Sequence, residues 1–218
     1  MYENKFSPKC IFLDLDGTIV DPRQAYIEAA KIGFHAIGQK PQEMKVAFEI
    51  PKRMEQHLSL DGLVYGDLNM FKRAYLQAYH TVTDEKTKLF PNMLKTINTL
   101  SLKAKLALIT MRHVPSQAVI KELKFFGIGK YFSSVMTAFD TSKPKPSPEA
   151  IFKGIEKFKV ETGDCLIAGD SVNDIKAGKA AGIRTVGLLS GLYFYDELAK
   201  EEPDRILPNL TNLLDIIE

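Results

Sequence analysis

The sequence predicts an α/β protein in which a parallel sheet is covered by helices on both faces, with a helical bundle inserted near its N-terminus. Short apolar segments alternate with amphipathic ones in residues 1–20 and 89–218, whereas residues 21–88 show helical spacing without apolar strands of the same quality. Near-continuous apolar strands separated by helices are typical of parallel sheets buried on both faces.

The expected strands are short apolar runs that end in polar or turn-forming residues. They are CIFLDLD at 10–16, KLALIT at 105–110, SVMTAFD at 134–140, CLIAGD at 165–170 and IRTVGLL at 183–189. Segments with helical spacing separate the later strands, for example PSQAVIKELKFFGI before SVMTAFD and SPEAIFKGIEKF before CLIAGD. This alternation predicts a core domain built from residues 1–20 and 89–218.

The inserted region, residues 21–88, is expected to form a separate helical domain. Helical spacing recurs at 23–38, 52–60 and 70–80, interrupted by glycines and prolines. Two short connections, near 18–22 and 84–91, would join this domain to the core. Two such connections make a hinge possible.

Composition limits the classes of function. The 218 residues are 45% hydrophobic and 26% charged, which is typical of globular proteins, and 29 basic against 27 acidic residues give a net charge of +2. This balance argues against a nucleic-acid-binding surface or a polybasic membrane anchor. No apolar run approaches the roughly 18 residues of a membrane span, and the first residues do not resemble a secretory signal. We therefore expect a cytoplasmic protein.

Carboxylates follow two of the predicted strands. Asp14 and Asp16 lie two residues apart at the end of the first strand, and Asp170 ends the strand at 165–170, with Asp174 four residues later. If these strands are neighbours, Asp14, Asp16 and Asp170 converge at the carboxyl edge of the sheet. Two carboxylates about 4 Å apart repel by about 4 kcal/mol at an effective dielectric near 20, so the site favours a cation. Mg²⁺ suits such oxygen ligands.

Two further groups would reach the same edge. Thr110 ends the strand at 105–110, and Lys143 lies in the proline-rich segment SKPKPSP. A metal ion, an ammonium group and a hydroxyl donor are what a phosphoryl group needs to offset its charge and bind its oxygens. The pattern therefore indicates phosphoryl chemistry.

These residues resemble, in order and spacing, the four motifs of the haloacid dehalogenase-like (HAD) phosphohydrolases: DLDGT at 14–18, Thr110, Lys143 in KPxP, and GDSxxD at 169–174. The helical insertion resembles the mobile cap of the branch that contains phosphoglycolate phosphatases, β-phosphoglucomutases and inorganic pyrophosphatases. The resemblance implies a Rossmann-like three-layer core and a cap that closes over the ligand.

The resemblance also implies catalytic roles. Asp14 would be the nucleophile that forms an aspartyl phosphate, and Asp16 would protonate the leaving oxygen and then activate water. Mg²⁺ would be bound by the carboxylates of Asp14 and Asp170 and by the backbone carbonyl of Asp16, and Asp174 would orient the waters on the metal.

Phosphoryl oxygens would be bound by Thr110 and Lys143. Substrate contacts are also expected from Thr18, the last residue of DLDGT, and from Met111 and Arg112, which follow Thr110. Met111 departs from the small or polar residue that often occupies this position in the family, although its backbone N–H stays available.

Specificity residues are expected in the inserted region. Lys52 and Arg53, in PKRMEQHL at 51–58, could bind a carboxylate or a second phosphate on the substrate. Relatives often have a glycine in this segment, and this chain does not. A solvated helix start is the structural alternative for both side chains.

Structural alternatives also exist for the aspartates. Asp170 could cap the helix that follows it, and Asp174 could be an acidic residue stabilised by the dipole of that helix. Cys10 and Cys165 begin strands that would lie side by side, and packing is the expected role of both thiols.

We expect a Mg²⁺-dependent phosphatase that acts on a small phosphorylated metabolite, either phosphoglycolate-like or a sugar phosphate, and that is a monomer or a homodimer. A β-phosphoglucomutase-type phosphomutase and an inorganic pyrophosphatase are the alternatives. A dehalogenase would not need Mg²⁺, and the second carboxylate, Asp16, argues against one. A catalytically silent binding protein would have lost the nucleophile.

Overall fold

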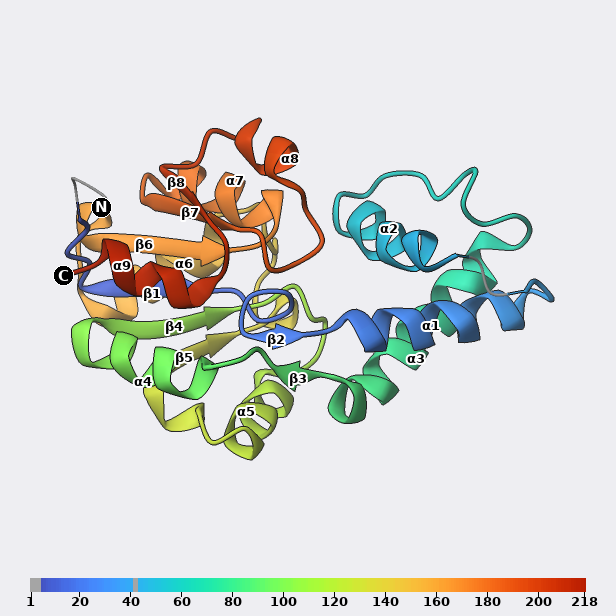
Figure 1. Cartoon of the computed structure of the whole chain (residues 1–218), viewed down its shortest axis with the longest axis horizontal. Coiled ribbons are helices and arrows are strands. Elements are labelled where there is room, and N and C mark those ends of the chain that lie inside the picture. Colours follow the sequence, from blue (N-terminus) through green and yellow to red (C-terminus); the bar gives the residue numbers. More distant parts are fainter. Residues whose placement is uncertain (1–4, 41–42) are drawn as a thin grey trace. The chain divides into compact units, whose positions relative to one another are not determined.

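Six strands form the central sheet, in the order β5-β4-β1-β6-β7-β8, and all neighbouring strands are parallel (Figure 1). The strands are β1 (Cys10–Leu13), β4 (Lys105–Ile109), β5 (Phe132–Met136), β6 (Cys165–Gly169), β7 (Arg184–Leu188) and β8 (Arg205–Leu207). The strand β1 lies between β4 and β6, so the carboxyl ends of three motif-bearing strands are adjacent.

Helices cover both faces of the sheet. The helices on one face are α4 (Met93–Lys103), α5 (Ser116–Phe125) and α9 (Leu213–Ile216), and those on the other face are α6 (Glu149–Phe158) and α7 (Val172–Ala181). Along β1, Ile11 and Leu13 pack on the first face, whereas Cys10 and Phe12 pack on the second, because successive side chains of a strand point to opposite faces. The predicted three-layer α/β fold is confirmed.

Shorter elements complete this part of the chain. They are α8 (Tyr195–Ala199) and the 3-10 helices η1 (Gly129–Tyr131), η2 (Ala138–Asp140), η3 (Thr162–Asp164) and η4 (Leu210–Asn212). The helix α8 contacts α7 and β8, and Leu198 of α8 packs in a small cluster with Ile175 of α7.

The predicted strand at 134–140 differs from the observed one. The strand β5 ends at Met136, and the chain then turns into η2 because Thr137 and Asp140 form a capping box. The Thr137 hydroxyl accepts from the Phe139 N–H, and the Asp140 carboxylate accepts from the Thr137 N–H. A reciprocal cap of this kind starts a helical turn and so ends the strand.

The structure, a computed structural model, describes residues 5–40 and 43–218, and it divides the chain into two units. The core unit comprises Met1–Val20 and Leu89–Glu218, and the inserted unit comprises Asp21–Lys88. A two-stranded sheet of β2 (Val20–Asp21) and β3 (Lys88–Leu89) pairs the two segments in which the chain passes between the units.

The inserted unit is helical and has a hydrophobic core of its own. Its helices are α1 (Arg23–Ala36), α2 (Met44–Glu55) and α3 (Leu68–Lys86). Phe34 and Phe71 are at most 1% exposed, and their ring centroids lie 5.0 Å apart. Pro51, expected to interrupt a helix, lies inside α2, so the segment at 51–58 is the last turn of a helix followed by a loop.

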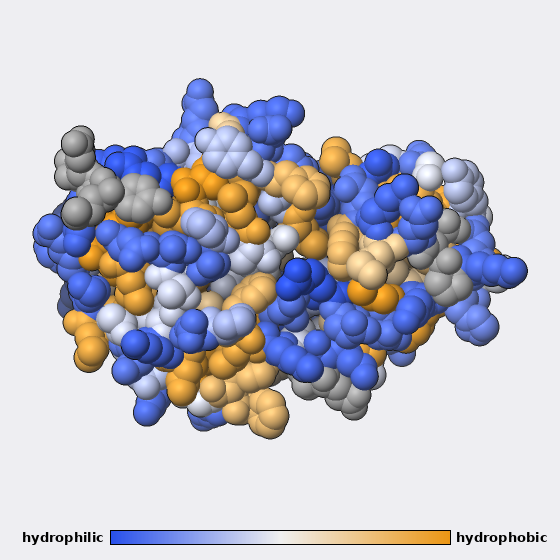
Figure 2. All heavy atoms as spheres, viewed as in Figure 1, coloured by the Kyte–Doolittle hydropathy of each residue, from blue (hydrophilic) through white to orange (hydrophobic). Residues whose placement is uncertain are grey.

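On the face shown in Figure 2, hydrophobic residues are interspersed with hydrophilic ones. Over the described part of the chain, and without reference to this view, Phe125 and Leu102 are among the exposed apolar side chains, with more than 80% of their surface accessible. Within residues 5–40 and 43–218, every helix is too short or too polar to cross a lipid bilayer.

Candidate active site

The predicted site residues follow three adjacent parallel strands. Asp14 comes directly after β1, Thr110 after β4 and Asp170 after β6. Because β1 pairs with both β4 and β6, these residues share the carboxyl edge of the sheet. Open α/β sheets bind ligands at this edge.

Three buried carboxylates meet there. Oxygen atoms of Asp14, Asp170 and Asp174 all lie within 4.8 Å of one another, and the three residues are between 1% and 6% exposed. The pairwise spacing allows one ion to bind all three side chains. The sequence predicted that Asp14, Asp16 and Asp170 would converge. Asp14 and Asp170 do so, whereas the third carboxylate of the cluster is Asp174 and the Asp16 side chain pairs with Arg112.

Lys145 is the lysine in this cluster. Its ammonium group donates to Asp14 Oδ1 and Asp174 Oδ1, both at 2.6 Å, and to the carbonyl of Ile109 at 3.0 Å. Lys143 is exposed, and its backbone N–H donates to Glu149. The placement of Lys143 in the site is therefore wrong, and the structure puts Lys145, two residues later, in its place.

The charges of the cluster do not cancel. The cluster contains three carboxylates and the ammonium group of Lys145, which leaves an excess of two negative charges if all are ionised. Burial disfavours the charge of Lys145, but the carboxylates of Asp14 and Asp174 outweigh this effect and raise its pKa above the ordinary value. Burial raises the pKa of Asp14 to about 8, against the opposing effect of Lys145. A divalent cation would supply the missing positive charge.

Asp170 is enclosed by small residues and donors. The Thr18 hydroxyl donates to Asp170 Oδ1 at 3.1 Å, and the Leu192 N–H to Oδ2 at 3.4 Å. A Cβ atom would lie 2.5 Å from this carboxylate at Gly17 and 1.7 Å from it at Gly191. Only glycine allows such close approach of the backbone. Thr18 was expected to contact the substrate. In the structure its hydroxyl is bound to Asp170.

The segment after β7 also borders the site, although it was not among the predicted site residues. Besides the close approach of Gly191, the Ser190 hydroxyl donates to the carbonyl of Gly17 at 2.7 Å, so this segment fixes the turn that follows Asp14. The available signal was a pair of small residues, SG, directly after a predicted strand.

Asp174 contacts both the start of α7 and the charged cluster. Its Oδ2 accepts from the backbone N–H of Ser171 in a capping box at the start of α7, and its Oδ1 accepts from Lys145. One oxygen thus stabilises the helix start and the other faces the charged cluster.

Asp16 is bound by Arg112. The Arg112 guanidinium donates from Nε and Nη2 to the two oxygens of Asp16, each at 2.7 Å, and from Nη1 to Glu122 of α5. Arg112 was expected to contact the substrate, and here its side chain is held between two carboxylates. Glu122 was not anticipated, because it lies in a helix that the sequence shows only as amphipathic.

Thr110 is 2% exposed, and its hydroxyl accepts from the N–H of Arg112 at 3.2 Å. Met111 is half-buried in the turn between these two residues. Both lie at the predicted sheet edge.

The predicted specificity residues lie in α2 of the inserted unit. Arg53 donates to Glu49 at 3.1 Å and to the carbonyls of Ser59 and Asp61, which ties the end of α2 to the following loop. Lys52 is 8% exposed, and its ammonium lies 3.9 Å from Glu49. Both side chains have partners within their own unit, and a role in substrate binding stays a prediction.

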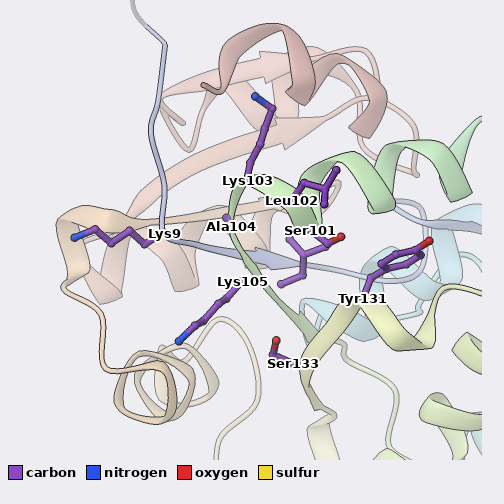
Figure 3. A pocket seen from close by; sticks show the side chains of 9 residues that line it. Lys9, Ser101, Leu102, Lys103, Ala104, Lys105, Tyr131 and Ser133 are labelled. Atoms are coloured by element: carbon purple, nitrogen blue, oxygen red, sulfur yellow. The ribbon is translucent and has the colours of Figure 1, made fainter.

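A separate pocket of about 360 Å³ lies near the start of β4 and is lined by Lys9, Lys103, Lys105 and Tyr131, among other residues. Figure 3 shows its three lysine side chains pointing away from one another. Their charges do not converge on one point, and the pocket carries no catalytic cluster.

Comparison with known proteins agrees with this geometry. The family model described as haloacid dehalogenase-like hydrolase matches residues 11–188. The chain belongs to this family of hydrolases, and the predicted family, fold and enzyme class are confirmed.

Two relatives and one solved structure illustrate the similarity. A phosphoglycolate phosphatase of Vibrio vulnificus is 29% identical over 219 residues, covering 96% of each chain. A pyrophosphatase, PpaX, of Anoxybacillus flavithermus is 29% identical over 212 residues, covering 95% of each. A haloacid dehalogenase-like hydrolase of Streptococcus pneumoniae has a TM-score of 0.78 at 21% identity, covering 96% of this chain and 98% of that one.

Proposed function

We propose that this protein is a Mg²⁺-dependent phosphatase that hydrolyses a small phosphorylated metabolite through an aspartyl phosphate on Asp14. The observation that carries the proposal is the buried cluster of Asp14, Asp170 and Asp174, of which Asp14 and Asp174 accept from the ammonium of Lys145. Such a cluster is costly to bury unless a cation offsets its excess negative charge.

The donor set fits Mg²⁺. Carboxylate oxygens from Asp14 and Asp170, with the backbone carbonyl of Asp16, would hold the ion, since Mg²⁺ prefers hard oxygen ligands and keeps several waters. When bound, the ion would withdraw charge from the phosphoryl oxygens. Asp174 would keep its place through the helix cap at Ser171 and would orient waters of the ion.

The protein residues would carry out two displacements. An oxygen of Asp14 forms a bond to phosphorus while the bond from phosphorus to the leaving oxygen breaks, and Asp16 gives its proton to that oxygen. A water oxygen then forms a bond to phosphorus and gives a proton to Asp16, while the bond from phosphorus to the Asp14 oxygen breaks. This step releases phosphate and restores both side chains. Lys145 offsets charge on Asp14 and on the phosphoryl oxygens, and Thr110 hydrogen-bonds to them.

Phosphoglycolate-like compounds are the first substrate class to test. A similar protein is named phosphoglycolate phosphatase and another is named pyrophosphatase, and the second name makes pyrophosphate the main alternative. Sugar phosphates and a phosphomutase reaction remain further alternatives. A cytoplasmic location and a monomeric or homodimeric state stay predictions.

The test is a phosphate-release assay on a panel of phosphate esters and pyrophosphate, with Mg²⁺ or with EDTA. We expect Mg²⁺-dependent hydrolysis of at least one ester by the unaltered protein. Asp14→Asn should lower the rate by at least about three orders of magnitude, as removal of other catalytic nucleophiles does. Activity retained in EDTA or in Asp14→Asn would contradict the proposal.

A further inference from the structure

The Asp16 side chain is held by Arg112 in a two-pronged ion pair. Both carboxylate oxygens of Asp16 accept from the guanidinium at 2.7 Å. The Arg112 side chain is 6% exposed and that of Asp16 is 13% exposed. A planar guanidinium matched to a carboxylate in this way is among the stronger and more specific charge pairs in proteins.

Glu122 pairs with Arg112 from the other side. It accepts from Nη1 of Arg112, and its side chain is 6% exposed. Arg112 therefore has a carboxylate partner on α5 that does not depend on Asp16. Since Asp16 is the more exposed of the two carboxylates, it is the partner that another anion could replace while Arg112 stays anchored.

This arrangement conflicts with proton transfer by Asp16. An Asp16 carboxylate that keeps both oxygens on Arg112 is directed at the guanidinium and has no oxygen left to approach a leaving group. To give a proton to the leaving oxygen, at least one of the two hydrogen bonds has to open. Opening them without a replacement would leave a buried guanidinium with donors unsatisfied.

We propose that Arg112 is a specificity-determining residue, which binds an oxyanion of the leaving group in exchange for Asp16 and thereby frees Asp16 for proton transfer. The inference rests on the proposed phosphatase function and names its substrate class: phosphate compounds whose leaving group carries a carboxylate or phosphate close to the bridging oxygen. Carboxylate and phosphate both match the two-pronged donor geometry of Arg112.

The direct test compares 2-phosphoglycolate with its primary amide, which has the same shape and a neutral leaving group, and uses pyrophosphate as the phosphate-bearing case. For the unaltered protein we expect kcat/KM on phosphoglycolate, on pyrophosphate or on both to exceed that on the amide by at least about 100-fold, because a site built to bind a polar substrate group can reject an analogue without that group by up to about 10⁴-fold to 10⁵-fold.

In Arg112→Gln, this ratio should fall to within about threefold of one, with most of the loss on the anionic substrate and in KM. Arg112→Lys, which keeps the charge but not the fork, should restore only part of the ratio. The matched control is Arg184→Gln. Arg184 is the first residue of β7, its side chain is 60% exposed, and it pairs with Asp204. This control should keep the unaltered ratio.

Arg112→Gln alone leaves the buried Glu122 carboxylate without this cation, which could destabilise the fold. The double variant Arg112→Gln/Glu122→Gln removes that carboxylate charge as well and so controls for misfolding. It should show the same loss of discrimination as Arg112→Gln. A ratio near one in the unaltered protein, or an unchanged ratio in both variants, would overturn the inference.

Hydrolysis of p-nitrophenyl phosphate separates the two proposals, because its leaving group needs little protonation and carries no carboxylate. Turnover of this ester by the unaltered protein but not by Asp14→Asn, together with no preference for anionic leaving groups, would leave the phosphatase function standing and reject the role of Arg112. Absence of turnover on every phosphate compound would reject both.

Discussion

Lys143 and Lys145 are separated by one proline, yet only Lys145 enters the acidic cluster. Lys145 is 3% exposed and contacts two carboxylates, whereas Lys143 is exposed. The sequence could not distinguish them, since KPKP offers two lysines in equivalent surroundings. The choice depends on the path of the chain between β5 and α6, where Glu149 binds the backbone N–H of Lys143.

This difference gives a matched pair of variants. Lys145→Ala should lower kcat by at least about 100-fold, because removing one positioned charge from a water-excluded site costs about two to three orders of magnitude. Lys143→Ala should stay within about twofold of the unaltered rate. Phosphate release measures both, and thermal unfolding checks that both fold. Equal effects of the two substitutions would contradict the assignment.

The raised pKa of Asp14 predicts how Mg²⁺ binding depends on pH. Burial raises the pKa of this carboxyl to about 8 in the metal-free protein, so a proton competes with the ion below that value. Because the ion binds the deprotonated carboxylate, Mg²⁺ affinity should fall by about tenfold for each pH unit below 8 and level off above it.

Titration calorimetry from pH 6 to pH 9 measures this dependence. Asp14→Asn is the control, since it removes the titrating group, and its residual affinity should not show that slope. Affinity that is constant between pH 6 and pH 8 in the unaltered protein would contradict the prediction.

At the scale of elements, the segment after β7 is part of the site. Gly191 lies so close to Asp170 that a Cβ atom would fall 1.7 Å from its Oδ2. A strand close to β7 is predicted from the sequence, but no local pattern indicates that the residues after it contact Asp170, which follows β6. That connection depends on how the chain turns after the strand, which local pattern does not determine.

Substitution of this glycine should therefore weaken the metal site. Gly191→Ala is expected to displace the Asp170 carboxylate and reduce Mg²⁺ affinity by about 10-fold to 100-fold, the range found when groups that orient metal ligands are altered. Gly163→Ala in η3 is the control, because a Cβ atom there meets no heavy atom within 4 Å. Calorimetry should find its affinity unchanged, and equal affinities for both variants would refute the role of Gly191.

The sequence predicts a strand well where its apolar run is near-continuous, and predicts its end poorly where a helix cap sets that end. The runs at 10–16, 105–110 and 165–170 are near-continuous apolar segments and were found. The predicted strand at 134–140 runs past the observed end at Met136, because the capping box of Thr137 and Asp140 starts a helical turn there. The short β8, with the sequence RIL, has too few residues for any period to appear.

At the scale of the whole molecule, the buried carboxylate cluster and the helical insertion belong to different units. The carboxylates of Asp14, Asp170 and Asp174 all lie in the core unit. The inserted unit is a separate helical unit, and its hydrophobic side chains pack around Phe34 and Phe71. Each unit has its own hydrophobic core. Stability of the insertion and metal binding by the core can therefore be perturbed separately.

Phe71→Ala tests this separation. Truncation of this fully buried ring should destabilise the inserted unit by about 3–5 kcal/mol, through lost burial and a cavity, while Mg²⁺ affinity of the core unit stays within about twofold. Met70→Ala, on the same helix at an exposed position, should change stability by less than about 0.5 kcal/mol. Calorimetric unfolding with and without Mg²⁺ measures both effects, and loss of Mg²⁺ binding in Phe71→Ala would contradict the separation.

The central claim is that Asp14 attacks phosphorus beside a divalent ion held by Asp170. Beryllofluoride, which mimics a phosphoryl group on a carboxylate, tests it most directly by ¹⁹F NMR. We predict a bound-fluoride signal that needs Mg²⁺, persists in Lys143→Ala and disappears in Asp14→Asn. A signal that survives Asp14→Asn, or that forms equally well in EDTA, would contradict the account.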